Sequence, residues 1–449
     1  MSTATLAMRD AAMAEGTLRI AQLTPGTGSF YCGSCLRDHT AVNALRAMGH
    51  DVVMVPLYLP FRLEQEASDD AEMYMGGINL YLQHRVKWLS HLPRGVKRLL
   101  DSTRLLRWSS KRSDMTDPGS LSELALATIR GEAGSQPAET ERLATWLVEE
   151  YQPDVIVLSN IMLAGLVHQL KKGTNVPVLC TLHGEDTFLD ALTEPARSHA
   201  WQSLREQAEH IDAFIAVSDY YAKTMQQRLN IPHDRLHVVH NGIDVDDFIG
   251  KGLARSYPPT VMYLARMCRD KGLHTLIEAF IMLCKDERVA DVQLCIAGVC
   301  LKSDRAFVRE MQRWLERSGC RDRVQFLPNV SRERKIELLQ QAHVLSVPAT
   351  YGESFGLYVI EALAAGTPVV QPAHAAFPEI VQRSGGGLLS VPDDAASLAD
   401  QLARVLSDEA LRVSLAARGR ASAIEHFSSR RMAADLAEIY RKHARAQQQ

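Results

Sequence analysis

The stretch Pro348–Val370, PATYGESFGLYVIEALAAGTPVV, contains the strand–loop–helix unit that decides the fold of this chain. The apolar run Val344–Pro348 is typical of a buried strand, and Thr350–Gly352 interrupt it before helical periodicity begins near Gly356. Gly366 is placed to cap that helix. A unit of this kind directs the free amides of a helix N-terminus into a crevice, where they favour an anion.

Two carboxylates, Glu353 and Glu361, stand eight residues apart in this segment. Eight residues of continuous helix would rise about 12 Å, the length of an extended sugar nucleotide from ribose to sugar. The spacing alone would also fit a buried unit with one solvated and one capping Glu. With Phe355-Gly356 after the first Glu and Ala362 after the second, the segment resembles the EX7E motif of retaining GT-B glycosyltransferases, the glycogen-synthase-like family 4.

The composition indicates a globular protein with more than one core. The 449 residues suggest two domains, and 46% apolar with 23% charged residues is an ordinary globular balance. A net charge of −3 gives no reason to expect nucleic acid as a partner. Because the first twenty residues lack a signal-like apolar stretch and the eight Cys are scattered, we expect a cytoplasmic protein with reduced thiols.

Strand-length apolar runs alternate with helix-length amphipathic stretches along the chain, which predicts an α/β fold with parallel sheets covered on both faces. The expected strands are Leu18–Leu23, Asp51–Leu57, Asp154–Ser159, Val176–Leu182, Ala213–Ser218, Leu236–His240, Thr260–Arg266, Val292–Gly298, Val324–Leu327, Val344–Pro348 and Thr367–Gln371. They form two doubly wound, Rossmann-like domains, with a ligand expected at the carboxyl ends of their strands. The resemblance extends this to a GT-B fold, with the two domains facing each other across a cleft.

The predicted domain boundaries follow from the polar stretch Asp244–Pro259. Residues 16–245 form the acceptor-side domain, with an insertion at 61–140 and a terminal helix, 428–446, that packs back onto it by resemblance. Residues 246–427 form the domain that binds the nucleotide sugar. Within the insertion, residues 85–112 carry nine Lys or Arg and one acid, which fits either a solvated insertion or peripheral contact with an anionic membrane.

Arg266 and Lys271 follow an expected strand and lead into an expected helix, Lys271–Lys285. A guanidinium can fork onto phosphate oxygens, and a lysine near a helix N-terminus supplies a point charge. The same pair would also fit a surface charge cluster, but it matches the phosphate-binding Arg and Lys of the resembled family. Gly298 closes the next strand, where its backbone can approach a ligand closely.

The resemblance implies further roles on the donor side. Glu361 would bond the ribose hydroxyls, and Glu353 would hold the transferred sugar together with the amides of Phe355, Gly356 and Leu357. The loop that contains Leu327 and Val330 would cup the nucleotide base, although both residues could equally belong to the core.

On the acceptor side, the glycines of Thr24–Gly28 and Gly33 surround the start of a helix expected around Leu36–Met48. A G-x-G-x-x-G spacing and a P-loop lysine are both missing there, so a dinucleotide or triphosphate site has little support. By resemblance, Gly28 and Gly33 would approach the donor diphosphate. His183, at the end of another strand, would lie beside the transferred sugar, the alternative being a capping role.

Cys32 and Cys35 form a CxxC pair with His39 four residues later, which is unusual for the resembled family. A cysteine at a helix N-terminus can be a reactive thiolate, and the three side chains could supply zinc ligands. No second CxxC completes such a site. We therefore favour a small-residue loop that shapes the acceptor pocket.

Together with these observations, the resemblance implies a retaining, metal-independent hexosyltransferase that needs no cofactor. Its donor would be a nucleotide diphosphate sugar, UDP first, with GDP or ADP as alternatives, and its acceptor a glycan, a lipid-linked molecule or a small molecule. His183, Glu353, Arg266 and Lys271 are the expected catalytic residues, and no residues are assigned to a metal. A non-hydrolysing sugar-nucleotide epimerase and an inactive GT-B binding module remain alternatives, and redox chemistry at Cys32 and Cys35 is a more distant one.

Overall fold

The computed structural model describes residues 16–25, 33–57, 129, 137–249, 258–289 and 291–446. The chain divides into two compact units. Unit 1 contains the described residues up to Val217, Ala222–Val239 and the chain from Ala433 onward. Unit 2 contains Ser218–Tyr221 and His240–Met432.

Unit 1 is built on a six-stranded sheet in the order β2-β1-β3-β4-β5-β6, and every pair of neighbours is parallel. Its strands are β1 (Arg19–Thr24), β2 (Asp51–Pro56), β3 (Val155–Leu158), β4 (Val178–Leu182), β5 (Ala213–Ala216) and β6 (Leu236–Val238). The chain first moves from β1 to β2 and then crosses to β3 on the other side of β1. This reversal between β1 and β3 makes the sheet doubly wound.

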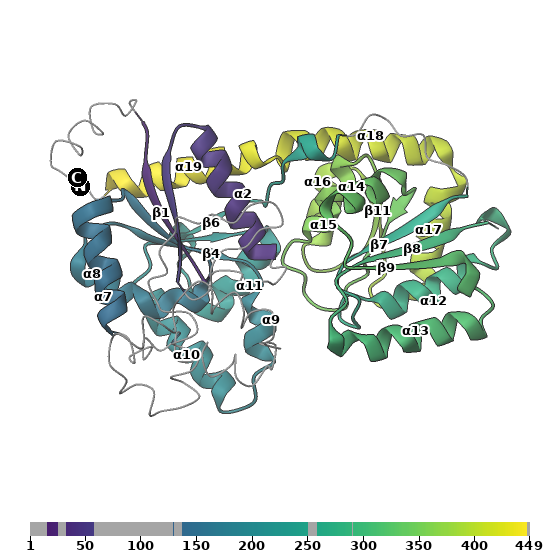
Figure 1. Ribbon diagram of the computed structural model, residues 1–449, viewed down its shortest axis with the longest axis horizontal. Helices are drawn as coiled ribbons and strands as arrows, with labels where there is room; N and C mark the ends of the chain where they lie inside the picture. The colour runs from purple at the N-terminus through teal and green to yellow at the C-terminus, as the bar shows by residue number, and fades with distance from the viewer. Residues whose placement is uncertain are drawn as a thin grey trace. The chain divides into compact units, whose positions relative to one another are not determined.

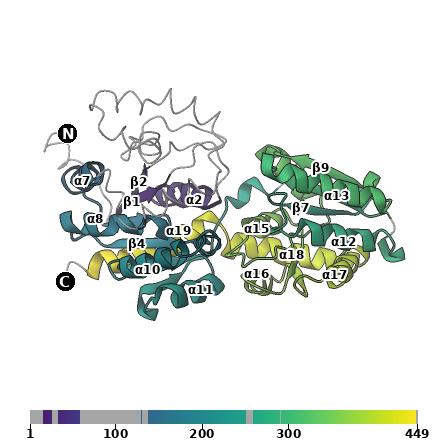
Figure 2. The ribbon, with the colours of Figure 1, turned by 90° about the horizontal axis from the view of Figure 1, so that it is seen from below.

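Helices cover both faces of the unit 1 sheet (Figures 1 and 2). One face carries α2 (Gly33–Ala47) and the terminal helix α19 (Ser429–Ala446). The opposite face carries α7 (Pro137–Trp146), α8 (Val167–Gly173), α9 (Glu185–Asp190), α10 (Ala196–Ala208) and α11 (Asp219–Leu229). Contacts of α19 with unit 1 include a hydrogen bond from Arg441 Nε to the Gly16 carbonyl, at 3.3 Å.

Unit 2 repeats the design with the parallel order β12-β11-β10-β7-β8-β9. Its strands are β7 (Thr260–Leu264), β8 (Gln293–Gly298), β9 (Val324–Pro328), β10 (Val344–Leu345), β11 (Val369–Pro372) and β12 (Gly387–Ser390). In chain order its helices are α12 (Leu273–Leu283), α13 (Arg305–Arg317), α14 (Arg332–Gln341), α15 (Leu357–Ala364), α16 (Phe377–Ser384), α17 (Ala395–Ser407) and α18 (Glu409–His426). Figure 1 shows α12 and α13 below the strands, and α14, α15, α16 and α18 above them.

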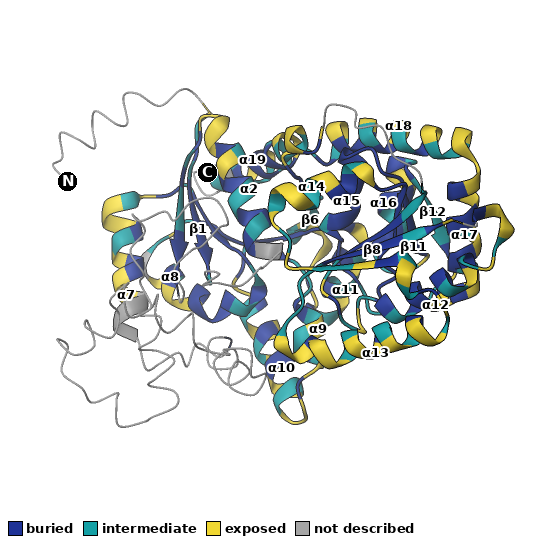
Figure 3. Cartoon of the chain, turned by 45° about the vertical axis from the view of Figure 1, so that its right-hand side comes forward, coloured by how far each residue is buried: buried dark blue, intermediate teal, exposed yellow. Residues whose placement is uncertain are grey.

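The central strands are almost entirely apolar because helices exclude water from both faces of each sheet. Every residue of β3, β4 and β5 is buried, and so is every residue of β7 after Thr260. Figure 3 shows the central strands of the sheets largely in the buried colour, with exposed residues on the outer sides of the helices. The prediction of parallel sheets covered on both faces is therefore confirmed.

Several predicted boundaries were wrong. The strand expected at Val344–Pro348 has ladder pairing only at Val344–Leu345, because the chain then turns into the loop before α15. The helix expected from Lys271 begins at Leu273, which places Lys271 in the preceding loop. The edge strand β12 was missed altogether, since Leu388 and Leu389 are a short apolar run directly after glycines.

Some predictions fall on residues that lie outside the described part of the chain. These are Gly28, Cys32, the basic stretch 85–112 and nearly all of the insertion 61–140. Among the helices that are described, none is both long enough and apolar enough to cross a membrane.

Acidification below about pH 6.5 is expected to destabilise unit 1, because His237 of β6 lies against His443 of α19. Their Nε2 atoms are 3.3 Å apart. Burial, and then the neighbouring His443, lowers the pKa of His237 to about 4. The unfolded chain therefore binds this proton at a higher pH than the folded one, and stability falls as the pH drops from about 6.5 towards 4.

Thermal unfolding between about pH 7 and about pH 5 checks this expectation. The melting temperature should fall less in His237→Gln than in the wild type, whereas His199→Gln, at an exposed position of α10, should follow the wild type. Equal pH dependence in all three proteins would contradict a folding-linked proton at His237.

Candidate active site

The candidate site lies at the point of unit 2 where the winding direction reverses. β7 and β10 are neighbours, with Val261 opposite Val344, and the chain leaves them towards opposite ends of the sheet. In doubly wound sheets such a reversal opens a crevice at the carboxyl ends of the strands. The loops that follow these two strands carry Lys271 and Glu353, so both residues belong to this crevice.

Lys271 and Glu353 form an ion pair, with 2.5 Å between Nζ and Oε2. Their side chains are only 21% and 11% exposed, so the pair is shielded from most of the solvent. Tyr351 and Tyr358 each donate a hydrogen bond to the same Oε2, at 3.0 Å. The structure thus brings the two predicted residues together and adds two phenols that the sequence reasoning missed.

Arg266 follows β7, and its guanidinium forks onto Asp304. The two hydrogen bonds measure 2.9 and 2.8 Å, and the hydrogen bond to Asp304 is the main reason why the pKa of Arg266 is raised. The Arg266 side chain remains 45% exposed, whereas that of Asp304 is 6% exposed. Asp304 therefore holds the guanidinium in a fixed orientation while leaving part of it accessible.

Glu361 lies on α15 and pairs with Lys335 of α14, with 2.7 Å between Oε1 and Nζ. Both side chains are nearly enclosed, at 5% and 12% exposure. A buried carboxylate is stable only with such a partner, because desolvation of an unpaired charge is costly. Glu353 and Glu361 are thus on different elements, a loop and a helix, instead of on one continuous helix.

The N-terminus of α15 opens into the same region as Glu353. Gly356 is its N-cap residue and has φ +89°, a conformation that favours glycine, and no side chain caps the helix there. Phe355 is buried beneath it, and Leu357 is the first helical residue. The uncapped amides of this turn are available to an anion.

The loops after β8 and β9 are tied to each other. Gly298 ends β8 with φ +133°, and a Cβ there would lie 2.1 Å from the Ala265 carbonyl oxygen, so a side chain is excluded. The Asn329 amide donates to the Gly298 carbonyl at 2.8 Å. Leu327 and Val330, on either side of this contact, are half-buried and do not belong to the buried core.

His183 lies in unit 1, directly after β4, and faces helix α2. Its Nε2 is 4.0 Å from Asp38 Oδ1, and its backbone amide donates to Glu185 Oε2 at 2.8 Å. Burial, followed by the positive charge of Arg37, lowers the pKa of His183 well below its usual value. The imidazole is therefore neutral at neutral pH.

The CxxC region differs from its prediction in one respect. Gly33 is the first residue of α2 instead of a residue that precedes the helix. Cys35 is buried, at 3% exposure, and His39 contacts Asn43 of the same helix. A buried thiol is a poor candidate for a reactive site, since reactive cysteines are at least partly exposed.

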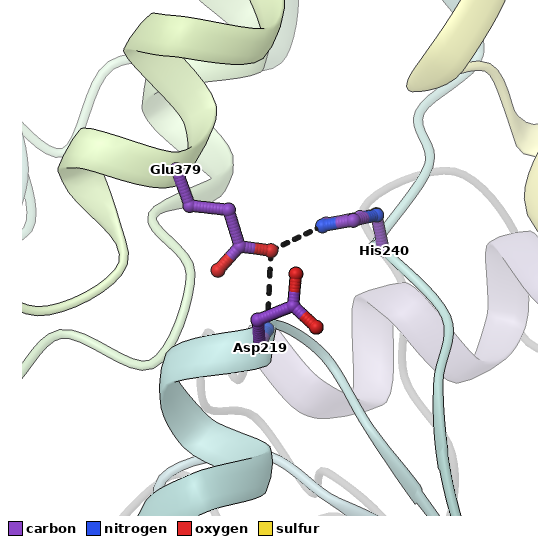
Figure 4. A group of neighbouring side chains, drawn as sticks. All are labelled: Asp219, His240 and Glu379. Atoms are coloured by element: carbon purple, nitrogen blue, oxygen red, sulfur yellow. Dashed lines mark hydrogen bonds and ion pairs between the residues drawn. The ribbon is translucent and has the colours of Figure 1, made fainter.

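A group of side chains with metal-ligand chemistry stands elsewhere in unit 2 (Figure 4). The ligand atoms of Asp219, His240 and Glu379 lie within 4.8 Å of one another. Glu379, however, accepts hydrogen bonds from the amides of Asp219 and Tyr220, at 3.1 and 3.3 Å, and pairs with His240 at 2.5 Å. Although burial opposes it, these bonds lower the pKa of Glu379. The hydrogen bonds from the backbone amides of Asp219 and Tyr220, which belong to unit 2, account for the position of Glu379 without a metal.

Four partners of the predicted residues were missed: Asp304, Lys335, Tyr351 and Tyr358. Tyr358 looks like a core aromatic in an apolar helix, and Lys335 lies in a charged run typical of a solvated helix face. Asp304 stands directly before a helix, where an Asp is a common capping residue, so its position did not point to Arg266 either.

Comparison with known proteins identifies the family. Residues 244–422 match the family described as glycosyl transferases group 1, and residues 124–247 match glycosyltransferase family 4. The phosphatidyl-myo-inositol mannosyltransferase of Mycobacterium leprae is 30% identical over 311 residues, which cover 68% of this chain and 77% of that protein.

Solved structures agree on the fold. Sucrose-phosphate synthase from Thermosynechococcus elongatus superposes with a TM-score of 0.69 and 22% identity over 96% of this chain and 100% of that one. Anabaena HepE in complex with UDP-glucose gives a TM-score of 0.64 and 16% identity, over 95% of this chain and 100% of that one. The chain therefore belongs to glycosyltransferase family 4 and is a glycosyltransferase with the GT-B fold.

Proposed function

We propose that this glycosyltransferase moves a hexose from a nucleotide diphosphate sugar to its acceptor with retention of configuration and without a metal ion. The observation that carries the proposal is the set of groups in the crevice of unit 2. Arg266 and Lys271 follow β7, and the uncapped amides of α15 follow β10, the neighbouring strand across the winding reversal. Cations and helix N-termini together are suited to a diphosphate.

The proposed mechanism assigns the residues as follows. The acceptor hydroxyl attacks the anomeric carbon on the face that the diphosphate leaves, the bond between that carbon and the phosphate oxygen breaks, and the hydroxyl proton passes to the departing phosphate oxygen. Arg266 and Lys271 neutralise charge that develops on the leaving phosphate. Glu361 binds the ribose, and Glu353 holds the sugar. His183, neutral through burial, can accept a hydrogen bond from a sugar or acceptor hydroxyl. Gly298, Leu327 and Val330 would border the base, and Gly28 and Gly33 the diphosphate.

The donor and acceptor are proposed by class. UDP is our first choice because Anabaena HepE binds UDP-glucose on a similar fold, with GDP and ADP as alternatives. The acceptor is a glycan, a lipid-linked molecule or a small molecule. Since a relative acts on phosphatidyl-myo-inositol, acceptor screens should include inositol phosphates and lipid-linked inositol. Cytoplasmic location and peripheral membrane contact through residues 85–112 belong to the same proposal.

Calorimetric titration with UDP-, GDP- and ADP-sugars, with and without EDTA, tests the proposal. We expect one donor to bind selectively, with a dissociation constant in the range of about 1 μM to 1 mM that is usual for enzyme substrates. EDTA should leave that affinity unchanged. Failure of every donor to bind would refute a nucleotide-sugar site. Conversion of the donor in the absence of an acceptor would indicate the epimerase, and binding without any turnover the inactive module.

A further inference from the structure

The Glu353 carboxylate is held in an asymmetric way. Three donors converge on Oε2: Lys271 Nζ at 2.5 Å and the hydroxyls of Tyr351 and Tyr358, each at 3.0 Å. None of the described residues donates a hydrogen bond to Oε1. One oxygen of the carboxylate is thus fully occupied by the protein, and the other is left for a ligand.

The two phenols remain hydrogen-bond donors over the whole physiological pH range. Burial, and then the adjacent Glu353 carboxylate, raises the pKa of Tyr351 and of Tyr358 well above the usual value. Each ring also lies under the Lys271 ammonium, whose Nζ is 4.8 Å from the Tyr351 centroid and 5.5 Å from the Tyr358 centroid. The phenols therefore hold the lysine and the carboxylate in one arrangement.

We propose that Tyr351 and Tyr358 are positioning residues that pin Oε2 of Glu353 and leave Oε1 as a fixed acceptor for a hydroxyl of the donor sugar. This inference rests on the proposed function, in which Glu353 meets the sugar. An ionised carboxylate can only accept hydrogen bonds, so the site selects a donor with a free hydroxyl at that position. An analogue without that hydroxyl should bind more weakly, because it would leave the buried carboxylate oxygen without a hydrogen-bond donor.

The test compares Tyr358→Phe and Tyr351→Phe with the wild type, using the nucleotide diphosphate sugar that the wild type binds and the matching free nucleotide diphosphate. Tyr151→Phe is the control, because its hydroxyl donates to the Ile20 and Asp51 carbonyls in unit 1. We expect kcat/KM to fall by about tenfold for each phenol removed, the usual effect of a hydrogen bond to a charged group. Affinity for the free nucleotide should stay within about twofold in every variant.

The difference between the sugar nucleotide and the free nucleotide is a readout that a merely structural role would not produce. The double variant Tyr351→Phe/Tyr358→Phe should lose more kcat/KM than either single variant, because both hydroxyls donate to the same oxygen. Its affinity for the free nucleotide should still stay within about twofold of the wild type. The control should retain the wild-type values of both quantities.

Two results would overturn the inference. They are unchanged kcat/KM in both Phe variants, and an equal loss of affinity for the sugar nucleotide and the free nucleotide. If Tyr358→Phe fails to fold, Tyr351→Phe, at a less buried position, decides the question. If the wild type binds none of the nucleotides, the proposed function itself fails, which is a distinct outcome.

Discussion

Replacement of Lys271 by alanine is expected to lower kcat by about 10²–10³-fold, with a smaller change in the donor KM, because its charge is most useful after the sugar–phosphate bond begins to break. The ammonium neutralises Glu353, with 2.5 Å between Nζ and Oε2. A bound diphosphate would add negative charge next to this pair, and the charge on the leaving oxygen grows further in the transition state. The lysine is thus proposed to stabilise the transition state more than the ground state.

Steady-state kinetics on Lys271→Ala and Lys271→Arg measure this effect. Lys285→Ala is the matched control, since Lys285 is exposed just beyond the other end of α12. Arginine should restore part of the rate, because it keeps the charge but has a planar, forked head group. An unchanged kcat with a raised KM in Lys271→Ala would instead assign the lysine to ground-state binding alone.

The sequence was informative where function depends on residues close together in the chain. Glu353, Gly356 and Glu361 lie within one loop–helix unit, and the structure puts the carboxylates on that loop and that helix. The alternation of apolar runs predicted both sheets, because strands buried on both faces consist almost entirely of apolar residues.

Long-range partners were not predictable in the same way. Asp304 reaches Arg266 from 38 residues away, and Lys335 reaches Glu361 from 26 residues away. Nothing in the local pattern of either residue indicates a partner on another element. Each charged residue that we predicted in the crevice of unit 2 is therefore paired with an opposite charge that is distant in the sequence and is brought close by folding. In each pair the two charges cancel, which limits the desolvation cost of burying them.

Replacement of Glu361 by alanine is expected to weaken donor binding by about 10–100-fold with little change in kcat, because two hydrogen bonds from ribose hydroxyls to a carboxylate would be lost. The pairing with Lys335 complicates the simple substitution. The Lys335 side chain is 12% exposed, and removal of its partner leaves an enclosed ammonium without a counter-charge. Some loss of stability is therefore expected as well.

A nucleotide that lacks one ribose hydroxyl separates the loss of ribose binding from the loss of stability in Glu361→Ala. The wild type should bind 2′-deoxy-UDP, or the 2′-deoxy form of whichever nucleotide it prefers, more weakly than the parent compound. Glu361→Ala should bind the two forms equally, because the group that distinguishes them is gone. Lys335→Met serves as the control, since it breaks the same ion pair but leaves the carboxylate in place. If Glu361→Ala still discriminates between the two nucleotides as the wild type does, another residue reads the ribose and Glu361 is a structural partner of Lys335.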